Sequence, residues 1–252
     1  MNYALITGAT SGIGMEMAIY LHKMGWKLIL TGRNETILRR MAQRFGNDTR
    51  YIALDLSERG SAETLYQFCQ GLRVDFLINN AGFGVFGEFT ETSLKQELEL
   101  IEVNIRSLHI LTKLFLRDMV KRDCGQILNV GSVAGFMTGP LLSSYYASKN
   151  YVVRLTTAIR EELRRKGSNV KIAVLAPGPV DTNFNNRAGV TFSAKPVNPK
   201  IVAQYGIDKA LEGRCIIIPY LPVKVGAVMA KLAPENVVAS VVWHIQKAKA
   251  KV

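Results

Sequence analysis

Short apolar runs alternate with helical patterns along most of the chain. Between the runs lie stretches such as residues 94–121, where Leu98, Ile101 and Ile105 recur at the steps of three and four that mark one helix face. Such alternation predicts the α/β class, with a doubly wound parallel β-sheet that carries helices on both faces. The runs expected to form strands are residues 3–7, 27–31, 50–54, 74–79, 126–130, 170–176 and 215–218.

No repeat or low-complexity linker divides the chain, so residues 1–252 are expected to form a single domain, with residues 219–252 as a C-terminal helical extension. After Pro234 the extension places one apolar face at helical spacing. Its members are Val237, Val238, Val241, Val242 and Ile245. We expect this face to pack on the domain or to close a dimer. The alternative, peripheral contact with a membrane, would place Lys247, Lys249 and Lys251 at the headgroups.

The formal net charge of +12 is spread along the chain and is not gathered into an aromatic-interleaved stripe, so nucleic acid is not expected as a partner. Three scattered cysteines without CxxC spacing indicate reduced thiols in a cytoplasmic protein, and neither a disulfide framework nor a metal site. The first residues lack the basic region of a signal peptide. The most apolar run is interrupted by Pro219 and Pro222 and is too short to span a membrane.

A glycine-rich segment, Thr7-Gly-Ala-Thr-Ser-Gly-Ile-Gly14, follows the first expected strand and precedes a helix that should begin near Gly12. Glycines at positions 8, 12 and 14 let the backbone turn tightly and approach a pyrophosphate, which then faces the N-terminus of the helix. The segment lacks the Gly-Lys-Ser/Thr ending of a nucleoside-triphosphate loop. It therefore predicts a dinucleotide site, and ATP is disfavoured.

This segment resembles the cofactor motif of the short-chain dehydrogenase/reductase family, and further motifs of that family follow in order. They are Asp55-Leu56, Asn79-Asn80-Ala81-Gly82, Asn104, Asn129-Val-Gly-Ser132, Tyr145-x-x-x-Lys149, Pro177-Gly178 and Thr182. Each motif alone is weak, but their order and spacing over positions 7 to 182 are very specific. The resemblance implies a Rossmann fold and a nicotinamide-dependent oxidoreductase.

The resemblance also implies roles for individual residues. The expected catalytic residues are Asn104, Ser132, Tyr145 and Lys149. The expected cofactor-binding residues are Gly8, Thr10, Ser11, Gly12, Ile13, Gly14, Arg33, Asp55, Leu56, Asn80, Ala81, Gly82, Tyr145, Lys149, Pro177, Gly178, Val180 and Thr182. Within the family pattern, Ser132 bonds the substrate oxygen, Lys149 holds the nicotinamide ribose, and Asn104 supports a water relay to Lys149.

Two adjacent tyrosines compete for the role of catalytic acid. On a helix, Tyr145 and Lys149 lie four residues apart and Tyr146 and Lys149 lie three apart, so both tyrosines are neighbours of the lysine. The family places its tyrosine thirteen positions after its serine, and Ser132 plus thirteen is Tyr145. We therefore expect Tyr145 to be the acid. Lys149, joined by the positive charge of the oxidised nicotinamide, is expected to lower its pKa from the free value of about 10.

The choice of cofactor depends on the end of the second expected strand, where Gly32 and Arg33 stand. A carboxylate there would bond the ribose 2′-hydroxyl of NAD, whereas a guanidinium suits the 2′-phosphate of NADP. Gly32 leaves no competing carboxylate, so NADP(H) is expected, and with it reduction as the working direction.

The substrate is expected to be a small apolar carbonyl compound, a ketone or a 3-oxoacyl type, reduced to an alcohol. The apolar residues expected around the site are Phe83, Val85, Phe86, Phe136, Met137, Leu141, Leu142, Val180, Phe184 and Phe192, with a mobile substrate lid over residues 183–197. A homodimer or homotetramer paired through residues 94–121 and 143–166 is expected. The alternative function is that of a non-enzymatic NADP(H)-binding regulator, against which the intact Ser132, Tyr145 and Lys149 argue.

Overall fold

The computed structural model describes residues 2–46, 48–182 and 197–248. Parallel strands form a seven-stranded sheet in the order β3-β2-β1-β4-β5-β6-β7. The strands are β1 (Tyr3–Thr7), β2 (Lys27–Gly32), β3 (Arg50–Ala53), β4 (Val74–Asn79), β5 (Gln126–Val130), β6 (Lys171–Leu175) and β7 (Ile216–Ile217). The doubly wound α/β prediction is confirmed, and the order reverses between β1 and β4, where such sheets bind ligands.

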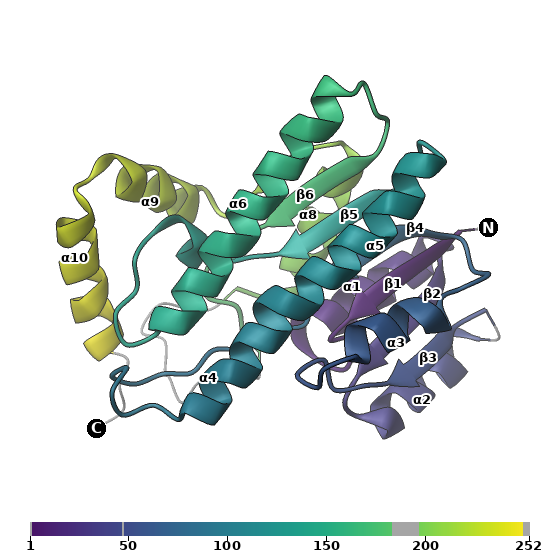
Figure 1. Ribbon diagram of the computed structural model, residues 1–252, viewed down its shortest axis with the longest axis horizontal. Helices are drawn as coiled ribbons and strands as arrows, with labels where there is room; N and C mark the ends of the chain where they lie inside the picture. The colour runs from purple at the N-terminus through teal and green to yellow at the C-terminus, as the bar shows by residue number, and fades with distance from the viewer. Residues whose placement is uncertain (1, 47, 183–196, 249–252) are drawn as a thin grey trace.

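Helices cover both faces of the sheet (Figure 1), and the central strands bury side chains on both sides. Ala4 and Ile6 face the side covered by α1 (Gly12–Lys23), α2 (Glu35–Phe45) and α8 (Pro199–Leu211). Leu5, between them, faces the side covered by α3 (Ser61–Phe68), α5 (Leu108–Lys121) and α6 (Ser143–Arg165). This is the period-two alternation of a strand buried on both faces.

The helix expected over residues 94–121 is not uniform. It runs as α4 (Leu94–Ile101), a π-helical segment η1 (Glu102–Ser107) and then α5. π-helical turns inside α-helices occur frequently at functional sites. Asn104, one of the expected catalytic residues, lies in this segment.

The C-terminal extension forms two helices, α9 (Leu221–Leu232) and α10 (Glu235–Lys247), on the left of Figure 1. The expectation of one apolar face on α10 is wrong in detail. Val238 and Val242 are buried together with Gln246, whereas Val237, Val241 and Ile245 are exposed. The buried side of the helix includes the polar Gln246, so two of its valines lie on that side and the other two lie on the exposed side. In the described part of the chain, no helix is long and apolar enough to cross a membrane.

Candidate active site

The glycine-rich turn joins β1 to α1, and its geometry explains the three glycines. Gly8 and Gly12 have φ of 65° and 56°, a region that favours glycine. A Cβ added to Gly14 would lie 2.3 Å from Asn80 Nδ2 and 2.4 Å from the Gly8 carbonyl oxygen. Asn80, at the end of β4, donates hydrogen bonds from Nδ2 to the carbonyl oxygens of Thr7 at 2.9 Å and Gly8 at 3.2 Å. Asn80 therefore occupies the inner side of the turn, and the outer side remains accessible to a ligand.

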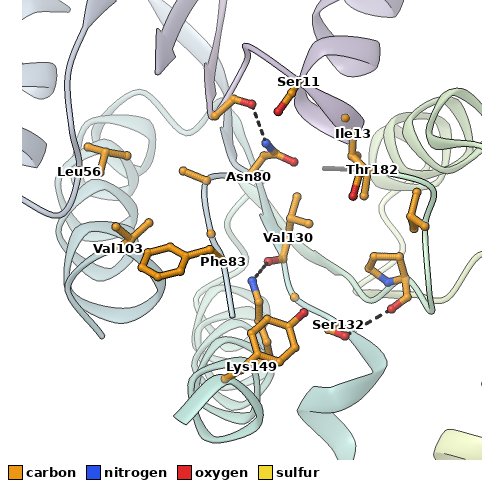
Figure 2. A pocket seen from close by; sticks show the side chains of 18 of the residues that line it. Ser11, Ile13, Leu56, Asn80, Phe83, Val103, Val130, Ser132, Lys149 and Thr182 are labelled. Carbon is orange, nitrogen blue, oxygen red and sulfur yellow. Dashed lines mark hydrogen bonds between the residues drawn. The ribbon is translucent and has the colours of Figure 1, made fainter. Parts of the chain in front are cut away.

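A cavity of about 380 Å³ opens beside this turn, at the carboxyl ends of the strands. It is lined by almost all the residues expected to bind a dinucleotide, part of which Figure 2 shows. They are Gly8, Thr10, Ser11, Gly12, Ile13, Arg33, Asp55, Leu56, Asn80, Ala81, Gly82, Tyr145, Lys149, Pro177, Gly178, Val180 and Thr182. Gly14 is not among the described residues that line the cavity, because it packs against Asn80 and Gly8.

Arg33 lies at one end of the cavity, at the end of β2. Its Nη1 is 3.5 Å from Asp55 Oδ2, and its side chain is 58% exposed. Burial raises the pKa of Asp55, but hydrogen bonds from Ser57 and the charge of Arg33 outweigh that effect, so the pKa lies below its usual value. Gly32 faces Thr10, since a Cβ added to Gly32 would lie 3.0 Å from Thr10 Cγ2.

The expected catalytic residues Ser132, Tyr145 and Lys149 line the other end of the same cavity. Ser132 follows β5, where its hydroxyl accepts a hydrogen bond from the Ala134 N–H at 3.1 Å. Lys149 on α6 donates from Nζ to the Val130 carbonyl oxygen at 2.9 Å (Figure 2) and lies 5.7 Å from the centre of the Tyr145 ring. Strand β5 and helix α6 therefore bring a hydroxyl, a phenol and an ammonium group together.

The surroundings shift the pKa values of two of these groups in opposite directions. Burial raises the pKa of Tyr145 to about 12, although a hydrogen bond with Ser132 opposes the rise. Burial lowers the pKa of Lys149 to about 8. The loss of water around the phenol acts against the lowering expected from Lys149 and the oxidised nicotinamide together, and that lowering stays a prediction. Tyr145 is therefore protonated at neutral pH and available as a proton donor.

Asn104 is not among the described residues that line the cavity, but it contacts Phe83, which does line it. Its Nδ2 donates to the Phe83 carbonyl oxygen at 2.9 Å and to Ser148 Oγ at 3.0 Å, while its Oδ1 accepts from the Phe83 N–H at 3.1 Å. A Cβ on Gly82 would lie 2.9 Å from Asn104 Oδ1 and 3.3 Å from Lys149 Nζ. Asn104 thus holds the loop after β4 close to Lys149, and the water relay stays a prediction.

Comparison with known proteins agrees with this geometry. The family model of the short chain dehydrogenases matches residues 2–191. The chain belongs to the short-chain dehydrogenase/reductase family. A very-long-chain 3-oxoacyl-CoA reductase of Mycosarcoma maydis is 35% identical over 183 residues, which are 69% of this chain and 52% of that protein. The chain spans between half and three fifths of the length of this and another curated relative.

Two solved structures of the same fold contain a nicotinamide cofactor. A short-chain dehydrogenase from Sphingobium yanoikuyae in complex with NADPH has a TM-score of 0.83 and 26% identity, covering 91% of this chain and 92% of that one. A short-chain dehydrogenase/reductase from Burkholderia phymatum in complex with NAD has a TM-score of 0.81 and 25% identity, covering 90% and 92%. A nicotinamide cofactor is therefore supported for this family member, and the likeness alone does not distinguish the phosphorylated form.

Sequence reasoning missed one polar pair in the cavity of this short-chain dehydrogenase/reductase. Tyr146 and Gln246 both line the cavity, and Gln246 Nε2 donates to the Tyr146 hydroxyl oxygen at 2.7 Å. Gly139 lies against the Tyr146 ring, since a Cβ there would approach ring atoms to 2.1 Å. The doubled tyrosine drew attention to Tyr146, but no sequence pattern indicated a partner one hundred positions away.

The expected apolar lining is met only in part. Phe83, Leu142 and Val180 line the cavity, and Val103 on η1 joins them. Phe136 packs instead in the core against Val152 and Val153. Of the remaining expected residues, Val85, Phe86, Met137 and Leu141 are not among the described lining residues. Phe184, Phe192 and all of the expected lid over residues 183–197 except Val197 lie outside the described residues.

Proposed function

We propose that this family member reduces an apolar carbonyl compound to an alcohol with NADPH. The observation that carries the proposal is a single cavity with the glycine-rich turn and Arg33 at one end and Ser132, Tyr145 and Lys149 at the other. A protein that only sensed NADP(H) would need the first end alone. The alternative, a non-enzymatic regulator, therefore leaves three converging catalytic side chains without a purpose.

The residues around the cavity fit the parts of such a cofactor. The turn at Gly8 and Gly12 and the N-terminus of α1 would hold the pyrophosphate, Asp55 and Leu56 the adenine, and Lys149 the nicotinamide ribose. A Cβ at Gly12 would lie 2.9 Å from Thr182 Cγ2, so a side chain there would fill the space between the turn and Thr182. When bound, NADPH supplies a hydride to the carbonyl carbon.

The chain itself handles the charge that develops on the substrate oxygen. In our proposal, the hydroxyls of Ser132 and Tyr145 donate hydrogen bonds to that oxygen, and Tyr145 transfers its proton as the alcohol forms. The resulting phenolate is stabilised by the Lys149 ammonium, 5.7 Å from the ring centre. The high pKa of Tyr145, about 12, suits a group that must carry its proton until the reaction begins.

NADPH is preferred in this proposal because Arg33 is the charged side chain that follows β2. Its contact with Asp55 involves Nη1, and a guanidinium has further N–H donors that remain for a 2′-phosphate. The site is open there, as the 58% exposure of the Arg33 side chain indicates, so a phosphate can approach.

The substrate class follows from the apolar lining and from one relative. Phe83, Val103, Leu142 and Val180 favour an apolar ketone or acyl chain. The Mycosarcoma maydis relative is a reductase of very-long-chain 3-oxoacyl-CoA, which makes 3-oxoacyl thioesters the first class to test. The deciding experiment is NADPH oxidation by the native protein and by Tyr145→Phe over ketones, 3-oxoacyl thioesters and steroids. Tight NADPH binding with no oxidation of any class would favour the regulator instead.

We also propose that the protein is a homo-oligomer paired through α4. Leu94 and Leu98 are 72% and 56% exposed on this helix, and Ile101 is 40% exposed. Three apolar side chains at helical spacing suit the isologous contact of a dimer. Light scattering at micromolar concentration should report more than one chain per particle, and a monomer would contradict this proposal.

A further inference from the structure

Helix α9 leaves most of its described large apolar side chains exposed to solvent. Ala227 is buried at 3% exposure, whereas Leu221, Val225 and Met229 are 72%, 54% and 60% exposed. These three residues are four apart and therefore lie on one face of the helix, and Leu232 near its end is 77% exposed. A helix on a domain normally buries its large apolar residues. Here Val223 and Ala227 face the protein, whereas three other large apolar residues face outward.

Helix α10 likewise exposes a row of apolar side chains. Val237, Val241 and Ile245 are about half exposed, at 49%, 53% and 49%, and again lie four apart. On the same helix, the Lys247 ammonium lies 4.6 Å from the centre of the Trp243 ring. A tryptophan beside a lysine is typical of the boundary between apolar and aqueous phases. We call the exposed apolar residues of α9 and α10 the C-terminal apolar stripes.

The charge of this segment distinguishes it from the other exposed apolar helix. Residues 219–252 carry five lysines and one glutamate, Glu235, whose carboxylate already accepts a hydrogen bond from Thr138 at 2.6 Å. Residues 88–102, around α4, carry five glutamates and one lysine. An exposed apolar helix in a lysine-rich segment suits an anionic lipid surface, whereas one in a glutamate-rich segment would be repelled by it.

We propose that the C-terminal apolar stripes bind the surface of an anionic membrane, with α9 and α10 lying in the plane of the interface. A second copy docked two-fold on the same stripes would bring two lysine-rich segments together, in a chain of net charge +12. The buried side of α10 carries Gln246, which lines the cavity. Membrane contact therefore places the cavity next to the phase in which an apolar substrate dissolves.

The test is co-sedimentation of the protein with vesicles of phosphatidylcholine alone and of phosphatidylcholine mixed with phosphatidylglycerol. We expect binding to the mixed vesicles only, weakening as salt rises, because lysine contacts with anionic lipid are screened. The double variant Val225→Glu/Met229→Glu should lower vesicle affinity by at least about tenfold, since two inserted side chains become anions. Both residues are exposed, so the fold and NADPH binding should be unchanged.

The matched control is Met24→Glu/Ile201→Glu, which makes the same chemical change at two exposed apolar residues outside α4, α9 and α10. It should leave vesicle binding intact. The proposal is overturned if the native protein stays in the supernatant with both kinds of vesicle, or if the two double variants lose binding equally. It is also overturned if native protein assembles without lipid and the α9 variant disperses that assembly, because a second copy would then cover the stripes.

Discussion

The low pKa of Lys149 makes a quantitative prediction about stability. The ammonium is buried, with 4% of the residue exposed, and its pKa falls from 10.5 to about 8. This difference corresponds to a destabilisation of about 3 kcal/mol, because each tenfold change in proton affinity is worth about 1.4 kcal/mol. Below pH 8 both the folded and the unfolded chain carry the charge, and the folded state bears the full cost. Between pH 8 and 10.5 only the folded chain has lost the proton, so the cost disappears.

The perturbation is Lys149→Met, which keeps the length of the side chain and removes the charge. The variant also loses the hydrogen bond that Lys149 donates to the Val130 carbonyl oxygen. Both the charged and the neutral amine can donate this bond, so its loss destabilises the variant at every pH. The informative quantity is therefore the free energy of unfolding of the variant minus that of the native protein. We expect this difference to fall by about 3 kcal/mol, in favour of the native protein, as the pH rises from about 7 to about 10.5.

The measurement is urea denaturation followed by circular dichroism across that pH range. The control is Lys113→Met, which makes the same substitution at an exposed lysine of α5 and reports the effect of the change away from the cavity. Tyr145 also titrates at high pH, but it is present in both proteins and largely cancels. A Lys149→Met difference that stays constant from neutral to alkaline pH would refute the proposed cost of burying the ammonium.

Three further predictions concern the reaction and its cofactor. Tyr145→Phe should abolish reduction and leave NADPH binding nearly unchanged, whereas Tyr146→Phe should mainly raise KM, because it loses only the contact with Gln246; steady-state kinetics that showed equal losses in both would contradict the assignment of the acid. Arg33→Ala should weaken NADPH binding by about tenfold, the lower end for a charge-assisted contact at an exposed site, and should barely affect NADH binding. Equal weakening of NADPH and NADH binding in a fluorescence titration would show that Arg33 does not contact the 2′-phosphate. Gly32→Asp should shift the preference toward NADH and lower the Tm slightly, since its Cβ approaches Thr10 Cγ2 to 3.0 Å; an unchanged cofactor ratio would contradict the position assigned to the 2′-phosphate.

The sheet could be predicted from the sequence because its central strands are short apolar runs buried on both faces. The bounds of β1, β4 and β5 were expected to the residue, and the other strands differ by one residue at one or both ends. The glycine-rich turn could be predicted equally well, since only glycine tolerates the close approach of Asn80. Local sequence is enough where a local backbone constraint decides the structure.

The remaining features depend on contacts that no local pattern records. The π-helical segment around Asn104 keeps the apolar spacing of an ordinary helix, so periodicity could not reveal it. The sign of the Tyr145 pKa change depends on how completely the fold removes water from the phenol. The division of the α10 valines depends on Gln246, which takes a place on the buried side and contacts Tyr146.

The contact between Gln246 and Tyr146 also has a consequence for biosynthesis. The residues proposed to hold the cofactor end at Thr182, whereas the substrate end is complete only when α10 has been made and has docked. The residues of the dinucleotide end are therefore synthesised before those that complete the substrate end. For the same reason, a fusion placed after α10 should disturb substrate recognition more than cofactor binding, and an affinity tag for functional work belongs at the other end of the chain.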